Sequence, residues 1–261
     1  MPTASVYSAA MQMNARPALP QRIVGLLRAK EFLVFYAIGL ATLDLCVPLA
    51  TGWLRAHQSL SDLAQANNSV LGDAVAGHGP AVVALGVGYL LVSAWFTAGY
   101  LRSLLGKLHW GPRDGLQYRR MLAYAVVIGL ADWALAAGFS AATDNAAAVQ
   151  AMYVALFAIN IPLLFVDYAI VASNVGLVRA LGRSLRTFAA NLPVSLLVLL
   201  FLVWVSVALD RLAPIQTEAA SRVLIALLIH TLVWGSVGFL ADVVLLCVYI
   251  DTVERGTLPP G

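Results

Sequence analysis

Charged side chains are scarce in this sequence: Asp, Glu, Lys and Arg together make up 11% of its 261 residues. A soluble domain carries about 25% charged residues, so this chain has too little polar surface to cover a water-exposed fold. Apolar residues instead make up 61%, and the mean hydropathy is +0.84. The composition excludes disordered proteins, secreted disulfide scaffolds and ordinary cytosolic enzymes, and it predicts an integral membrane protein.

Cysteine and the common catalytic motifs are also missing or sparse. The two cysteines, Cys46 and Cys247, lie inside apolar runs and not at metal-ligand or CxxC spacing, so neither a zinc site nor a redox pair is indicated. The sequence has no GxxxxGK[ST], HExxH, GxSxG or GxGxxG, the signatures of phosphate loops, zincins, serine hydrolases and dinucleotide-binding folds. We therefore expect a non-enzymatic protein with no catalytic residues, no metal ion and no cofactor.

Six stretches are long and apolar enough to cross a bilayer. The hydrocarbon core is about 30 Å thick and a helix rises about 1.5 Å per residue, so one span needs about 20 apolar residues. Continuous helix is expected because lipid offers no water to satisfy backbone polar groups. The fold class predicted is therefore all-α, a polytopic integral membrane protein with a six-transmembrane-helix bundle. The predicted spans are 32–54, 80–105, 121–142, 149–173, 192–209 and 223–250.

The distribution of Lys and Arg predicts the orientation. All but three of the 16 basic residues fall beside the termini or in one set of alternating loops, and the exceptions are Arg55, Arg211 and Arg222. Because cytoplasmic loops are enriched in Lys and Arg, we expect both termini to be cytoplasmic, in the inner (plasma) membrane of the cell. The net charge of +3 follows from this topology, and we expect no nucleic-acid partner.

The predicted domains follow from the spans. Residues 1–20 are expected to be a disordered cytoplasmic N-terminus, 21–251 the six-helix transmembrane domain and 252–261 a cytoplasmic tail. Residues 21–30 have the pattern of a short amphipathic helix at the cytoplasmic surface. The first span is expected to be retained, because it is longer than the 7–15 apolar residues of a typical signal peptide and contains Asp44.

Carboxylates inside the spans require an explanation. An ionised carboxylate facing lipid at the bilayer centre costs about 2.5–3.5 kcal/mol, so such groups are expected to face the bundle interior. They act either as a proton or cation relay or as hydrogen-bond anchors between helices. Asn160 and His230 are further polar candidates, and we expect His230 to be a hydrogen-bonded packing residue. The four carboxylates are those of Asp44, Asp132, Asp167 and Asp242.

The loop 174–191, NVGLVRALGRSLRTFAAN, has the pattern of an amphipathic helix. Arg179, Arg183 and Arg186 fall at i, i+4 and i+7, and apolar residues occupy the other face. We expect a short cytoplasmic helix between spans four and five, lying in the inner interface with its arginines toward anionic lipid head groups. Two alternatives remain: the charges only set the topology, or the helix docks a partner protein.

Residues 167–193 resemble the acidic, spacer and x-A-L-x-x-S-x-R pattern of prokaryotic six-helix membrane proteins related to the membrane domain of glycerophosphoryl diester phosphodiesterases. The segment 100–120, with Gly106 and Pro112, is similar to the preceding cytoplasmic loop of those proteins. The resemblance covers about a third of the chain and implies a six-helix bundle. Those families have no general catalytic assignment, so no hydrolase activity is implied. The matching residues are Asp167, Ala180, Leu181, Ser184, Arg186 and Asn191.

Three functions are compatible with these patterns. The favoured one is a non-enzymatic permease-like or accessory subunit of a transport or envelope complex, whose partners would be membrane lipids, other membrane subunits and a separate ATPase. The second is a lipid-binding membrane scaffold that acts through Arg179, Arg183 and Arg186. The third is a membrane-embedded lipid-modifying enzyme that uses aspartates near the inner interface.

Overall fold

The computed structural model describes residues 18–28, 39, 80–110, 117–142, 151, 158–159, 161–212 and 220–256. Every element within these ranges is helical and no strand occurs in them, which confirms the all-α prediction. The helices are α2 (Leu19–Leu27), α6 (Pro80–Lys107), α7 (Gln117–Ala142), α9 (Val166–Ser173), α10 (Leu177–Ala190), α11 (Leu192–Leu212) and α12 (Ala220–Glu254).

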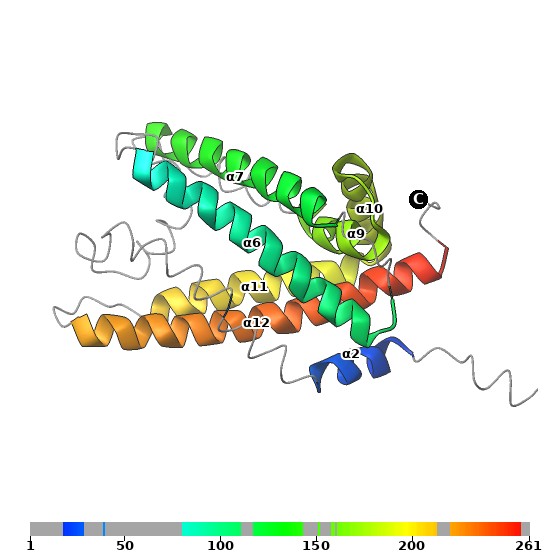
Figure 1. The fold of residues 1–261 in the computed structure, drawn as a ribbon. Coiled ribbons are helices and arrows are strands. Elements are labelled where there is room, and N and C mark those ends of the chain that lie inside the picture. Colours follow the sequence, from blue (N-terminus) through cyan, green and yellow to red (C-terminus); the bar gives the residue numbers. More distant parts are fainter. Residues whose placement is uncertain are drawn as a thin grey trace, which may run out of the picture.

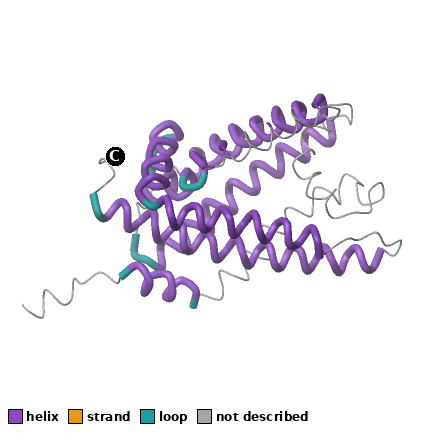
Figure 2. The backbone as a smooth tube through the Cα atoms, turned by 180° about the vertical axis from the view of Figure 1, so that it is seen from behind, coloured by secondary structure: helices purple, strands orange, loops and turns teal. Residues whose placement is uncertain are grey.

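Two pairs of long helices are joined at one end by short ones. Figure 1 shows α6 beside α7 and α11 beside α12, with α9 and α10 at the end where α6 and α12 finish and α7 and α11 begin. The short helix α2 packs against α12 at the same end, and Figure 2 gives the same arrangement from behind. We call this end of the bundle the basic end. The segments predicted to be cytoplasmic meet there, and these segments carry all but three of the Lys and Arg residues.

The long helices coincide with predicted spans. Helices α6, α7, α11 and α12 contain the predicted spans at 80–105, 121–142, 192–209 and 223–250. Of the span predicted at 32–54 the structure describes residue 39 alone, and of the span predicted at 149–173 it describes residues 151 and 158–159 and the helical segment Ile161–Ser173. Within the described part, the helix Thr231–Glu254 is long and apolar enough to cross a membrane. The bent pair Ile161–Ser173 and Leu177–Ala190 would be a second if it counted as one span. This result gives weak support to membrane association.

The core of the described residues lies at the basic end. Its fully buried side chains come from the last turns of α6, from α9 and the residue before it, from the last turns of α12 and from α2. They are Leu26, Tyr100, Leu101, Leu104, Phe165, Val166, Ile170, Val171, Val243, Leu246, Tyr249 and Ile250. The last turns of α6 and α12 therefore hold the short helices α2 and α9 in place.

The outer faces of the long helices are apolar as well. Several large apolar side chains expose more than half of their accessible surface: Trp95 on α6, Leu130 on α7, and Leu197 and Trp204 on α11. Soluble monomers rarely expose large contiguous apolar patches. An apolar surface spread over four long helices fits a lipid environment, in which such side chains need no cover.

A sharp bend separates α9 from α10. Asn174 adopts a left-handed conformation, with φ of 50° and ψ of 42°, and ends α9, as Gly or Asn commonly does at a helix C-terminus. Helix α10 begins after Gly176. The chain bends by 118° between the helical segment Ile161–Ser173 and α10. Helix α10 therefore runs across the basic end and not along the bundle (Figure 1).

Candidate functional site

Helix α10 confirms the predicted amphipathic helix between residues 174 and 191, but it has three faces and not two. The face that packs on the bundle consists of Ala180, Arg183, Ser184 and Thr187, at i, i+3, i+4 and i+7, together with Phe188. Ser184 completes this contact by accepting, through Oγ, a 2.9 Å hydrogen bond from the backbone N–H of the residue that precedes α9. The protein thus covers a face of α10 that contains three polar residues as well as Ala180 and Phe188.

The apolar side of α10 is left exposed. Val178 is 84% exposed, and Leu181 and Leu185 are 37% and 45% exposed. These three residues lie at i, i+3 and i+7, which places them in one stripe along the helix. A surface helix of a soluble protein turns its apolar stripe toward the core. We call Val178, Leu181 and Leu185 the α10 stripe; it stays exposed although Ala180 and Phe188 of the same helix are buried.

The three arginines of α10 are divided between two faces. Arg179 and Arg186 are exposed at i and i+7, whereas Arg183 belongs to the packed face and is only 8% exposed. The pattern i, i+4, i+7 had placed all three on one outward face. The spacing of charges identified the helix but not its contact side, because Arg183 is also adjacent on the helical wheel to Ala180, Ser184 and Thr187.

The bend between α9 and α10 is fixed from α7. The Arg120 guanidinium donates hydrogen bonds to the backbone carbonyl of Asn174 and, over 2.7 Å, to its Oδ1. A pocket of about 770 Å³ opens beside this contact and is lined by both Arg120 and Arg179. Sequence reasoning did not single out Arg120, although it follows Arg119 at the predicted start of a span. The bend therefore places two arginines on the same side of α10.

Two of the predicted intramembrane aspartates are described with their surroundings. The Tyr168 hydroxyl donates a 2.5 Å hydrogen bond to Asp242 Oδ1, which links α9 to α12. Asp167 Oδ1 accepts a 2.9 Å hydrogen bond from the backbone N–H of Tyr168. The Tyr168–Asp242 contact is of the kind expected for an anchor between helices.

The other predicted polar positions cannot be placed in the same way. Asp44 and Asn160 lie outside the described residues, as do the side chains of Asp132 and His230. Among the described residues, no group of three or more His, Cys, Asp or Glu side chains could hold a metal ion. Cys247, which lies in one of the apolar runs of the sequence, is a buried free cysteine.

Further polar contacts join the elements of the basic end. Ser173 Oγ and Tyr249 Oη are 2.8 Å apart, which adds a second link between α9 and α12. Asn191 Nδ2 donates a 2.8 Å hydrogen bond to Thr252 Oγ1, so the residue between α10 and α11 is tied to α12. The sequence did carry a signal for these contacts: Asp242 and Tyr249, seven residues apart, lie on one face of α12.

Helix α2 confirms the amphipathic helix predicted near residues 21–30, and an ion pair holds it. Arg22 Nη2 lies 2.7 Å from Glu254 Oε2 near the end of α12, and the two side chains are 9% and 14% exposed. Leu26 of α2 is buried in the core. The helix is therefore docked by both a charge pair and apolar burial, which amphipathic patterning alone did not reveal.

Comparisons of this chain with protein-family models, with curated proteins and with solved structures find no match. The resemblance to phosphodiesterase-related membrane proteins therefore stays a prediction.

Proposed function

We propose that this chain is a six-span protein of the plasma membrane with both termini in the cytoplasm. We further propose that it is a non-enzymatic accessory subunit of a transport or envelope complex, anchored in the cytoplasmic leaflet through α10. The observation that carries this proposal is the orientation of α10: Arg183, Ser184 and Thr187 pack on the protein together with Ala180 and Phe188, while the α10 stripe is exposed. An exposed apolar stripe next to exposed arginines matches the boundary between acyl chains and anionic head groups.

The energy of this placement is favourable. Full burial of a Val or Leu side chain stabilises by about 1.5–3 kcal/mol, and each Arg near an anionic leaflet contributes about 1 kcal/mol. With three stripe residues and the exposed Arg179 and Arg186, the interface gains several kcal/mol over water. Helix α10 follows a bend of 118° and runs across the end of the long helices, which is the direction expected of an interfacial helix (Figure 1).

Six spans are supported by two independent features. The distribution of Lys and Arg alternates with every predicted span, and the four long helices described all carry exposed apolar side chains. The basic end then corresponds to the cytoplasmic face. In this orientation α2 and α10 both lie at the inner interface.

The polar contacts of the basic end favour a supporting role over a proton relay. Asp242 is engaged by Tyr168, and Tyr249 by Ser173, so two helices are linked where a relay would need open access. We therefore assign solute movement, and any ATP hydrolysis, to partner subunits. The lipid-scaffold function is part of this proposal, because the same helix would order anionic lipids around the complex.

The test measures the depth of α10. In a Cys46→Ala, Cys247→Ala background, single cysteines replacing Leu181 and Arg186 are labelled with a fluorophore in liposomes. Lipids brominated along their acyl chains should quench the label at position 181 and leave the label at 186 much brighter. Equal quenching at both positions would remove the interfacial placement of α10.

A second arm tests the head-group contact. The double variant Arg179→Gln, Arg186→Gln should retain less phosphatidylglycerol per protein after extraction with a membrane-solubilising polymer. The matched control is Arg119→Gln, Arg255→Gln, which removes two exposed charges from the same end without touching α10. Unchanged retention in the α10 variant, or equal loss in both, would count against a specific role of these arginines.

A further inference from the structure

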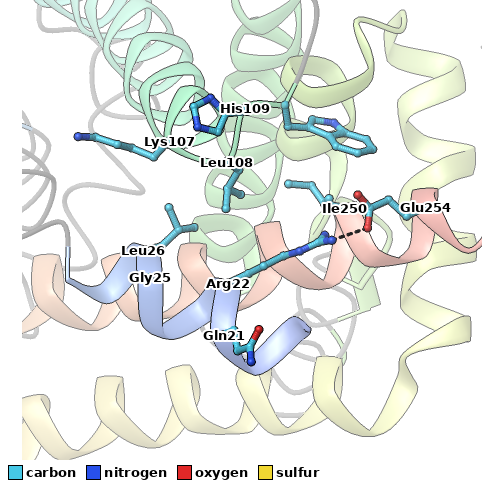
Figure 3. Close-up of a pocket in the computed structure, with 10 residues that line it drawn as sticks. Gln21, Arg22, Gly25, Leu26, Lys107, Leu108, His109, Ile250 and Glu254 are labelled. Atoms are coloured by element: carbon cyan, nitrogen blue, oxygen red, sulfur yellow. Dashed lines mark hydrogen bonds and ion pairs between the residues drawn. The ribbon is translucent and has the colours of Figure 1, made fainter. Parts of the chain in front are cut away.

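A second pocket lies at the basic end, and no residue of α10 lines it. It has a volume of about 480 Å³ and opens between α2, the end of α6 and the end of α12 (Figure 3). Its polar lining includes the side chains of Arg22, Lys107, His109 and Glu254. Its apolar lining includes Leu26 and the side chains contributed by Leu108, Trp110 and Ile250. The pocket thus combines basic groups with apolar walls.

The end of α6 adopts an unusual conformation at this pocket. The N–H of Trp110 donates to the carbonyl of Leu105 over 3.0 Å, and the N–H of His109 donates to that of Gly106 over 3.1 Å. These two bonds form a Schellman motif, in which the left-handed position is usually a glycine. Here that position is His109, with φ of 53°. A left-handed non-glycine residue costs about 1–2 kcal/mol, and such strain often occurs at functional sites.

The strained position directs His109 to the pocket. Figure 3 shows Leu108 pointing from the end of α6 toward α2 and α12, with His109 beside it and the Lys107 side chain extending away from Arg22. On the far side, Glu254 orients the Arg22 guanidinium through the 2.7 Å ion pair. Three basic side chains from two helices, those of Arg22, Lys107 and His109, therefore line one pocket together with apolar side chains.

We propose that this pocket binds the phosphate group of an anionic phospholipid, with Lys107 and His109 as the main contacts and the acyl chains along the partly exposed Leu108 and Trp110. Charge complementarity selects the phosphate, and the apolar walls select an amphiphile over a free ion. The inference rests on the proposed function for the position of the basic end at the inner interface. It adds a defined lipid site, built by α2, α6 and α12, that is independent of α10.

The test uses the full chain in detergent and native mass spectrometry. The probes are phosphatidylglycerol, phosphatidylethanolamine and inorganic phosphate, each titrated separately. We expect one saturable phosphatidylglycerol adduct and weaker binding of the other two probes. Loss of a charge-assisted hydrogen bond should weaken phosphatidylglycerol binding about tenfold in both Lys107→Gln and His109→Gly.

His109→Gly is the informative variant, because glycine suits the left-handed position and the fold should be kept or stabilised. Wild-type affinity in both His109→Gly and Lys107→Gln would overturn the proposal. Equal binding of inorganic phosphate, or of phosphatidylethanolamine, would also overturn it. The variant Arg179→Gln, Arg186→Gln should keep this adduct, so a failure of the α10 proposal and a failure of this one give different results.

Discussion

The hydrogen bond between Tyr168 and Asp242 gives a quantitative test of the anchor interpretation. Tyr168 is 2% exposed, and its hydroxyl lies 2.5 Å from Asp242 Oδ1. Hydrogen bonds between membrane helices contribute about 0.6 kcal/mol on average and about 1.7 kcal/mol at most. Because this contact is short and its acceptor is a carboxyl oxygen, we expect a value in the upper part of that range, about 1–1.5 kcal/mol.

The measurement is a double-mutant cycle with Tyr168→Phe, Asp242→Ala and the double variant. The free energy of unfolding is obtained in mixed micelles by titration with a denaturing detergent, followed by circular dichroism. The matched control is Tyr118→Phe, which removes an exposed hydroxyl that donates a 3.3 Å hydrogen bond to the Leu91 carbonyl. We expect the control to change stability by less than about 0.5 kcal/mol.

The outcome separates anchor from relay. A coupling energy near zero between positions 168 and 242 would refute the assignment of Asp242 as an interhelical anchor. The same conclusion would follow if Tyr168→Phe were no more destabilising than Tyr118→Phe. A coupling of the expected size, together with unaltered insertion of all variants, would support it.

Two further predictions concern the short helices. Glu254→Ala should release α2, because it removes the 2.7 Å ion pair of the nearly buried Arg22, and should lower hydrogen-exchange protection of Leu19–Leu27; the charge-swapped pair Arg22→Glu, Glu254→Arg should recover part of it. Protection unchanged by Glu254→Ala would mean that apolar packing alone holds α2. Gly182→Ala should stabilise the protein by about 0.5–1 kcal/mol, because Gly182 is exposed in the middle of α10 and an added Cβ meets nothing within 4 Å. A lower melting temperature for Gly182→Ala would contradict the described environment of α10.

The sequence was sufficient to locate helices and insufficient to pair them. Long apolar runs predicted the positions of α6, α7, α11 and α12 to within a few residues, because helix is the only economical backbone for such runs in lipid. Amphipathic spacing also identified α2 and α10. These features depend on local periodicity, which a single sequence contains.

Contacts between helices depend on rotation and register, which local periodicity does not determine. The charge pattern placed Arg183 with Arg179 and Arg186, but packing chose the face that contains Arg183, and the apolar stripe was left outside. Asp242 accepts a hydrogen bond from Tyr168, which directly follows Asp167, another of the predicted intramembrane aspartates. The left-handed His109 was also unpredictable, because sequence rules place glycine there.

The most direct test of the whole account is a topology map of the full chain. Reporters that are active only in the cytoplasm or only outside it are fused after Gly115 and Gly261, and after Asn68, Asn145 and Thr217; Gly261 follows the last predicted span, and the other four positions lie between predicted spans. Six spans with cytoplasmic termini predict cytoplasmic signal for the first pair and external signal for the other three. A reporter after Gly115 or Gly261 that is active only outside the cytoplasm would contradict the account.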